Sequence, residues 1–110
     1  AAFLKERFGD RFNVFTGDSR SEIKNIAKKI EEKIGLVHID GGHTFDIANS
    51  DLENSIDVCL ELQTPFILLD DTDDIRVRMA ADRHIIKGRL QTETLCGGWE
   101  QVSNSLMRVK

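Results

Sequence analysis

The chain has 110 residues, with 19 acidic and 15 basic side chains and a net charge of −4, which leaves room for one domain. A general nucleic-acid or membrane-surface binder would carry an excess of basic residues, and no apolar run is long enough to span a bilayer. The two cysteines, Cys59 and Cys96, lack the tight spacing of a disulfide framework and favour reduced thiols in a cytoplasmic protein. The sequence leaves the oligomeric state open, a homo-oligomer included.

The first third of the chain predicts a helix, a strand and a second helix. Apolar residues among charged ones at the start are typical of an amphipathic helix that ends near Gly9. Residues 12–15 predict a strand, with residues 17–19 as its exit loop. The run Ser19–Glu22 fits a capping box, and the helix that it opens is predicted to end at Gly35. The apolar stripe of this helix has helical spacing and comprises Ile23, Ile26, Ala27, Ile30 and Ile34.

Two apolar segments further along the chain each run directly into aspartates. Leu36–Asp40 predicts a buried parallel strand that ends on an acid, followed by two glycines that allow a tight turn and then by His43. Phe66–Asp70 predicts a second such strand and is followed by three more aspartates within four residues. Because these carboxylates repel one another at pH 7, a chain would rarely gather them beside a buried strand for stability alone.

Two more helices are predicted around the second acid-tipped strand. Residues 45–62 carry one apolar stripe, and Pro65 follows this helix because proline cannot continue it. Residues 75–87 predict the other helix. Its inward side chains are expected to be Met79, Ala80 and Ile86. Of the remaining histidines, His84 is assigned to the solvated face of this helix, and His38 to the core or to a polar neighbour within the first acid-tipped strand.

The order of these elements predicts the fold class. Residues 91–96 and 105–109 complete the pattern as two strands that pair antiparallel at the edge of the sheet. Alternation of helices and strands is typical of an α/β protein with a mostly parallel sheet and helices on both faces. We therefore expect a three-layer sandwich with an antiparallel C-terminal edge strand.

The crossover between the two acid-tipped strands is expected to bring their ends together. Strand–helix–strand units are right-handed and often place their strands side by side, and neighbouring strands lie about 4.8 Å apart. In open α/β sheets, ligands bind at the edge formed by the carboxyl ends of the strands. We therefore expect Asp40 to lie close enough to Asp70 and Asp71 for the three carboxylates to share one cation.

Three segments, Phe15–Ser19, Val37–His43 and Leu68–Thr72, together resemble a class I S-adenosylmethionine-dependent methyltransferase. They are most similar to the metal-assisted small-molecule O-methyltransferases of the catechol and macrolide-sugar kind. The resemblance covers nearly all of the chain and implies a Rossmann-like fold. The first strand and the glycine-rich cofactor loop of that family would precede Ala1, so the resemblance implies one partial domain over residues 1–110.

The resemblance also implies the roles of individual residues. A magnesium ion would be held by Asp40, Asp70 and Asp71. S-adenosylmethionine would be contacted by Gly17, Asp18, Ser19 and Asp40. His43 would act as the general base that takes the proton from the hydroxyl of a small-molecule acceptor, since an imidazole titrates near neutrality.

Each of these assignments has a plainer alternative. For Asp40 it is a cap on the next helix, and for residues 70–74 it is a solvated turn. For His43 it is a cap on the helix that begins near Thr44. Ser19 fits a cap of its own helix as well as it fits a contact to the cofactor, and the two roles are compatible.

Three functions are compatible with the sequence. The first is O-methylation of a small-molecule hydroxyl by S-adenosylmethionine with the help of a divalent metal. The second is a non-catalytic fragment or degenerate domain that keeps the fold, because no Gly-x-Gly loop occurs in the chain. The third is a metal-dependent hydrolase that uses the same acids to activate water, although the sequence supplies no phosphate-binding loop for it.

Overall fold

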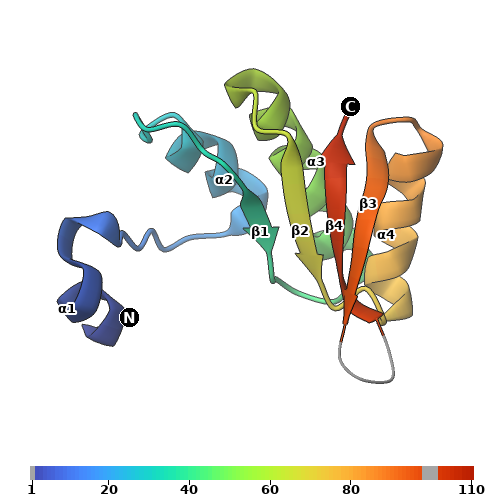
Figure 1. The fold of residues 1–110 in the computed structure, drawn as a ribbon, viewed down its shortest axis with the longest axis horizontal. Coiled ribbons are helices and arrows are strands. Elements are labelled where there is room, and N and C mark those ends of the chain that lie inside the picture. Colours follow the sequence, from blue (N-terminus) through green and yellow to red (C-terminus); the bar gives the residue numbers. More distant parts are fainter. Residues whose placement is uncertain (1, 98–101) are drawn as a thin grey trace.

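The computed structural model describes residues 2–97 and 102–110, which form the mixed α/β fold of Figure 1. In chain order the elements are α1 (Ala2–Phe8), η1 (Gly9–Arg11), α2 (Ser19–Ala27), β1 (Val37–Ile39), α3 (Phe45–Leu62), β2 (Phe66–Asp70), α4 (Ile75–Ile86), β3 (Leu90–Gly97) and β4 (Val102–Val109). Helix α3 and strand β2 have the predicted bounds. Among the described helices, none is long and apolar enough to cross a membrane.

The four strands form one mixed sheet in the order β1-β2-β4-β3. Only β1 and β2 are parallel, whereas β4 is antiparallel to both β2 and β3. The prediction of a mostly parallel sheet is therefore wrong, although the antiparallel pairing of the last two strands is confirmed. The C-terminal strand is also not at the edge. Since β3 and β4 form a hairpin whose second strand pairs with β2, β3 takes the place at that edge of the sheet, opposite β1.

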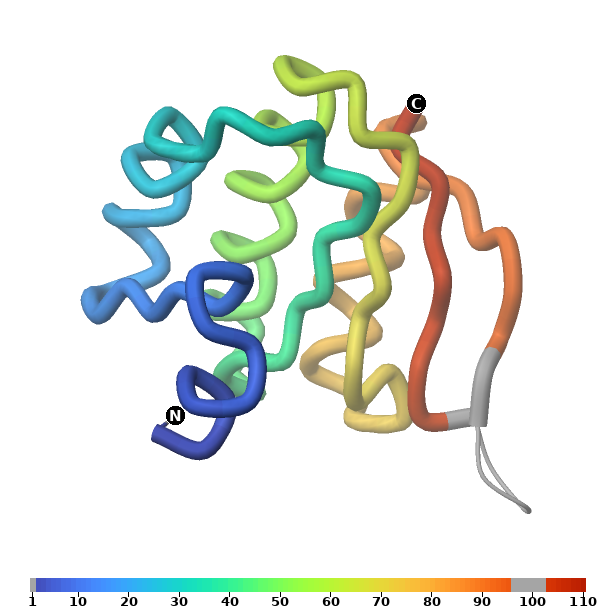
Figure 2. Tube along the Cα trace, turned by 60° about the vertical axis from the view of Figure 1, so that its left-hand side comes forward, coloured from blue at the N-terminus to red at the C-terminus, as the bar shows by residue number. Residues whose placement is uncertain are grey.

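The helices that contact the sheet cover one of its faces. Helices α3 and α4 lie side by side behind the sheet in Figure 1, and the turned view in Figure 2 agrees. Helix α2 packs against α3, and α1 contacts only η1. Because no described helix covers the opposite face, the described residues form two layers and not the three-layer sandwich that we expected.

The core lies between the sheet and helix α3. Leu52 of α3 and Ile67 of β2 are fully buried there, and Met107 lies beside Ile67 in the sheet register. The open face of the sheet carries the alternate side chains. On this face the Arg108 guanidinium lies 4.7 Å from the centre of the Phe66 ring, which partly shields the ring from water.

The segment between η1 and α2 is not a strand, which contradicts the prediction for residues 12–15. A strand needs a neighbour for its backbone hydrogen bonds, and among the described strands the sheet ends with β1. Helix α2 also differs from the prediction, because it ends at Ala27 and does not continue to Gly35. The chain then turns toward β1, where the Ile34 carbonyl accepts a hydrogen bond of 2.7 Å from the Thr64 hydroxyl.

Helix α4 turns a different face toward the core from the one predicted. Ala80 is buried as expected, but Met79 is exposed and Ile86 is 84% exposed. His84, which we expected in solvent, is only 1% exposed, while His38 is exposed on the open face of the sheet. The small side chains of the alanines on α4 allow a close approach to α3, so the stripe that contains them packs inward in place of the bulkier one.

Burial of His84 is expected to make the stability of the fold depend on pH. The Nε2 atom of His84 donates to Asn49 Oδ1 at 3.0 Å, whereas Nδ1 is buried and has no hydrogen-bond partner. Burial, and secondly the positive charge of Arg89, lower the pKa of His84 below its ordinary value of 6.5. At His84, the unfolded chain therefore binds more protons than the folded one below pH 6.5, so the contribution of this residue to stability falls as the pH is lowered.

The expected slope is at most about 1.4 kcal/mol of unfolding free energy per pH unit below pH 6.5. Urea unfolding between pH 5 and pH 7.5 measures it. His84→Gln keeps a donor for Asn49 but does not titrate, so its stability should fall less steeply with pH. Parallel curves for the two proteins would show that His84 is not the group responsible.

Candidate metal and cofactor site

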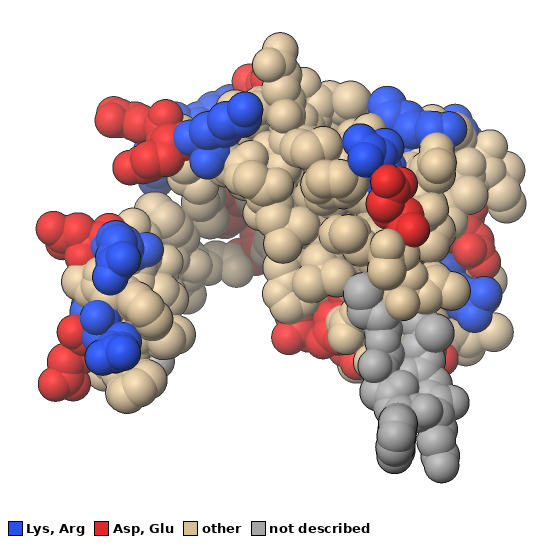
Figure 3. Space-filling view, viewed as in Figure 1, with Lys and Arg blue, Asp and Glu red and all other residues tan. Residues whose placement is uncertain are grey.

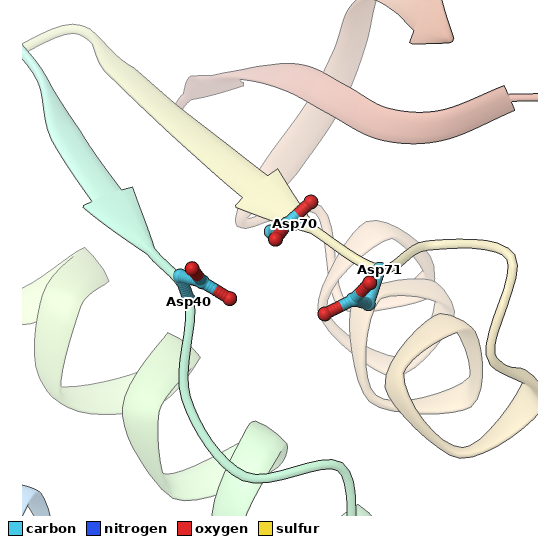
Figure 4. A group of neighbouring side chains, drawn as sticks. All are labelled: Asp40, Asp70 and Asp71. Carbon is cyan, nitrogen blue, oxygen red and sulfur yellow. The ribbon is translucent and has the colours of Figure 1, made fainter. Parts of the chain in front are cut away.

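The structure brings three carboxylates together at one edge of the sheet. Strands β1 and β2 are parallel neighbours in register, so Asp40 and Asp70 leave the sheet at the same level. Carboxylate oxygens of Asp40, Asp70 and Asp71 all lie within 4.8 Å of one another, around one space between the two strand ends (Figure 4). In Figure 3 acidic atoms gather at the lower rim of the molecule, where β1 and β2 end. The juxtaposition follows from the crossover expected from the sequence.

The close approach of these acids is electrostatically unfavourable in the chain alone. The pKa of the Asp40 carboxyl is raised. The largest cause is its hydrogen bond with the Asp70 carboxyl, followed by repulsion from the charge of Asp70, by desolvation and by the charge of Asp71. Asp71 also has a left-handed backbone, with φ of 59°, which is uncommon outside glycine. Such conformations cluster at binding and active sites. A bound cation would therefore reduce the repulsion among these carboxylates.

The donor set fits a divalent cation. Magnesium binds oxygen ligands at 2.0–2.1 Å in octahedral geometry, so two ligands on opposite sides of one ion are about 4.2 Å apart. Oxygens within 4.8 Å of one another reach that arrangement through small side-chain movements. Three carboxylates from the protein also leave ligand positions for water or substrate oxygens. Metal binding by these three residues stays a prediction.

His43 lies beside the acidic cluster and does not cap a helix. Its Nε2 atom is 2.7 Å from Asp71 Oδ2, and its Nδ1 atom is 3.5 Å from Asp74 Oδ2. The cap of α3 is Thr44, whose hydroxyl accepts a hydrogen bond from the backbone of Ile47. Asp74 caps α4, and Arg76 lowers the pKa of its carboxyl to about 2, so Asp74 carries its negative charge at neutral pH.

The tautomer of His43 follows from these contacts. A carboxylate can only accept, so the short contact to Asp71 places the imidazole proton on Nε2 in the neutral ring. The lone pair that can take up a proton is then on Nδ1, on the side of Asp74. Carboxylates of Asp71 and Asp74 therefore lie beside the two nitrogens of the ring, at 2.7 Å and 3.5 Å.

The loop before α2 is built differently from the prediction. The cap of α2 is Asp18, whose carboxylate accepts from the Arg20 backbone at 2.9 Å, and Ser19 is the first residue of the helix. The predicted capping box is therefore wrong. Arg20, through its side chain first and its backbone second, holds the pKa of Asp18 at about 2. Gly17 allows a close approach, because a Cβ atom there would lie 2.7 Å from Glu22 Cγ.

The Ser19 hydroxyl points instead to a residue that our prediction missed. It donates a hydrogen bond of 2.6 Å to Oδ1 of Asp51, a buried carboxylate on α3. The other oxygen of this carboxylate lies against the loop after β1, only 2.7 Å from where a Cβ atom of Gly41 would be. Asp51 therefore connects residues 17–19, which we call the Ser19 loop, with the loop that follows Asp40. The only sequence signal is an acid next to the apolar stripe of α3, one residue before the buried Leu52.

Comparison with known protein families identifies one family for this chain. A family model described as "Methyltransferase domain" matches residues 1–72, which is more than half of the 110 residues. The matched range contains all the residues predicted from the sequence to bind metal or cofactor, together with His43 and Asp51. No curated protein and no solved structure matches the chain.

Proposed function

We propose that this chain, which belongs to the methyltransferase domain family, transfers a methyl group from S-adenosylmethionine to a hydroxyl of a small molecule. A divalent cation such as Mg²⁺ would assist the transfer. The observation that carries the proposal is the convergence of Asp40, Asp70 and Asp71 within 4.8 Å at the carboxyl ends of two parallel strands. Ligand sites of open α/β sheets lie at this edge.

The side chains at this edge of the sheet would have two roles, metal binding and proton transfer. Asp40, Asp70 and Asp71 would hold the cation through oxygen atoms. When bound, such an ion lowers the pKa of a coordinated hydroxyl and fixes its direction. Nδ1 of His43 would accept the proton that the acceptor hydroxyl loses, while Asp71 holds the ring through Nε2.

The cofactor would lie against the two loops that precede α2 and α3. Gly17, Asp18, Ser19 and Asp40 are the residues proposed to contact it. Ser19 donates its proton to Asp51, so its oxygen presents lone pairs to a donor such as the amino group of an adenine. The Asp18 carboxylate is held by Arg20, with the closest contact at 2.8 Å, so it is ionised and fixed in place.

The direct test is methyl transfer in the full-length protein with S-adenosylmethionine, Mg²⁺ and a panel of vicinal diols. We expect methyl ether formation that stops when EDTA removes the metal and returns when Mg²⁺ is added in excess. Calorimetry with S-adenosylmethionine separates this function from a non-catalytic domain, which would not bind the donor. Release of phosphate from a phosphatase substrate in the absence of a methyl donor would indicate a hydrolase and would contradict the proposal.

His43→Gln is expected to lower kcat about 100-fold, because general bases typically contribute 10²–10⁴ in rate. The amide keeps a donor for Asp71 but cannot take up a proton, so Mg²⁺ affinity should change less than about threefold. Steady-state kinetics and a metal titration measure the two effects. If kcat is unchanged, another group removes the proton.

A further inference from the structure

The position of the Ser19 loop has to be fixed by something other than the sheet. Residues 12–15, which lead into this loop, form no strand in the part of the chain that the structure describes. Figure 1 shows this segment leading from α1, which lies apart from the sheet, to α2, which packs beside α3. Contacts from α3 must therefore place the loop relative to β1.

Helix α3 supplies these contacts from three residues spaced three apart on one side. Asp51 accepts the Ser19 hydroxyl, Asn54 donates to the Arg20 carbonyl at 3.3 Å, and Asp57 pairs with Lys24 at 2.9 Å. We call this set the α2–α3 seam. Of the described contacts, that of Asn54 is with the backbone of Arg20 and those of Asp57 are with the charges of Lys24 and Arg89. None of these partners is proposed to contact the cofactor. Asp51 alone touches a residue that we propose to contact cofactor.

Asp51 is also set apart by its burial and by its second neighbour. It is 5% exposed, whereas Asp57 is more exposed and shares its charge with Arg89. One Asp51 oxygen binds Ser19 and the other packs against Gly41, so a single carboxylate spans both loops. Hydrogen bonds to a carboxylate at 2.6 Å are among the strong ones. A glycine at 41 leaves the room that this carboxylate requires.

We propose that Asp51 is a positioning residue for the S-adenosylmethionine site, which holds Ser19 and the loop after Asp40 at the separation that the methyl donor needs. This inference rests on the proposed function. Asp51 acts through Ser19 and Gly41, and it does not contact the donor or the metal. Its loss should therefore weaken binding of the donor and leave binding of Mg²⁺ unchanged.

The test compares three variants of the full-length protein by calorimetry with S-adenosylmethionine and with Mg²⁺. Asp51→Ala should raise the Kd for the donor about tenfold, the typical effect of losing one hydrogen bond to a charged group. Asp51→Asn keeps an acceptor for Ser19 and should stay within about threefold of the wild type. Asp57→Ala, on the same seam, is the matched control and should also stay within threefold.

The outcomes separate this inference from the proposed function. If the wild type does not bind the donor, the proposed function fails, and the positioning role fails with it. If the wild type binds the donor and Asp51→Ala binds it equally well, only the positioning role is wrong. Equal weakening by Asp57→Ala would also overturn it, since the seam would then act as a whole. Should Asp51→Ala not fold, Asp51→Leu keeps the same branched shape without an acceptor and is expected to show the same tenfold loss.

Discussion

Replacement of both Asp70 and Asp71 by asparagine is expected to reduce methyl transfer more than about 100-fold, measured as initial rate with saturating Mg²⁺. Asparagine keeps the side-chain volume but removes two of the three charges that face the proposed ion. Loss of a group that only supports a ligand typically costs 10–100-fold in metal affinity or activity, so loss of two ligands should cost more.

The same double variant should not lose stability. Like charges in this cluster repel one another and raise the pKa of Asp40, so their removal relieves repulsion in the metal-free protein. Thermal unfolding without metal is expected to give a midpoint equal to or above that of the wild type. Asp46→Asn makes the same type of substitution at one carboxylate in the first turn of α3 and should keep its activity. A double variant with normal activity would contradict a role for these acids in catalysis.

Leu52→Ala is expected to destabilise the fold by about 3 kcal/mol, the largest effect on stability that we predict. Leu52 is fully buried between α3 and the sheet, so its truncation removes apolar contacts and leaves a cavity. In a domain of this size the change corresponds to a fall in Tm of roughly 10–20 °C. Domains of this size have total stabilities of about 5–15 kcal/mol, so the loss is a large share.

Leu60→Ala is the matched control for this experiment. It makes the same substitution in the same helix, but Leu60 is 51% exposed. Its truncation should cost less than about 1 kcal/mol, because most of the side chain is already in water. Similar Tm values for the two variants would show that α3 does not pack against the sheet as described.

The elements that the sequence predicted correctly are those with strong local signals at both ends. Helix α3 begins after a threonine that caps it and ends before Pro65, and both bounds were predicted. Strand β2 is a continuous apolar run between Pro65 and the aspartates. The approach of Asp40 to Asp70 could also be predicted, because it needs only that a right-handed crossover places two parallel strands side by side.

The predictions that failed depend on partners that are distant in the sequence. Residues 12–15 have the pattern of a strand, but among the described strands none pairs with them. The periodicity of α4 supports more than one inward face, and only packing against α3 selects the face with His84. The antiparallel pairing of β3 with β4 was predicted, but no local pattern specifies that β4 inserts beside β2.

The candidate site shows the same division. Acids at strand ends are visible in the sequence, because they interrupt apolar runs. Asp51 is not, because its role comes from a contact with Ser19, 32 residues earlier in the chain. The left-handed backbone of Asp71 is equally invisible, since aspartate follows aspartate there without a glycine to indicate a turn.

The central claim, that three carboxylates form one site for a divalent ion, is tested most directly by calorimetric titration of the purified protein with Mg²⁺ in the absence of methyl donor. The predicted result is binding of one ion per chain by the wild type and by Asp46→Asn, and loss of this binding in Asp40→Asn. A wild type that takes up no Mg²⁺, or an Asp40→Asn variant with an unchanged isotherm, would contradict it.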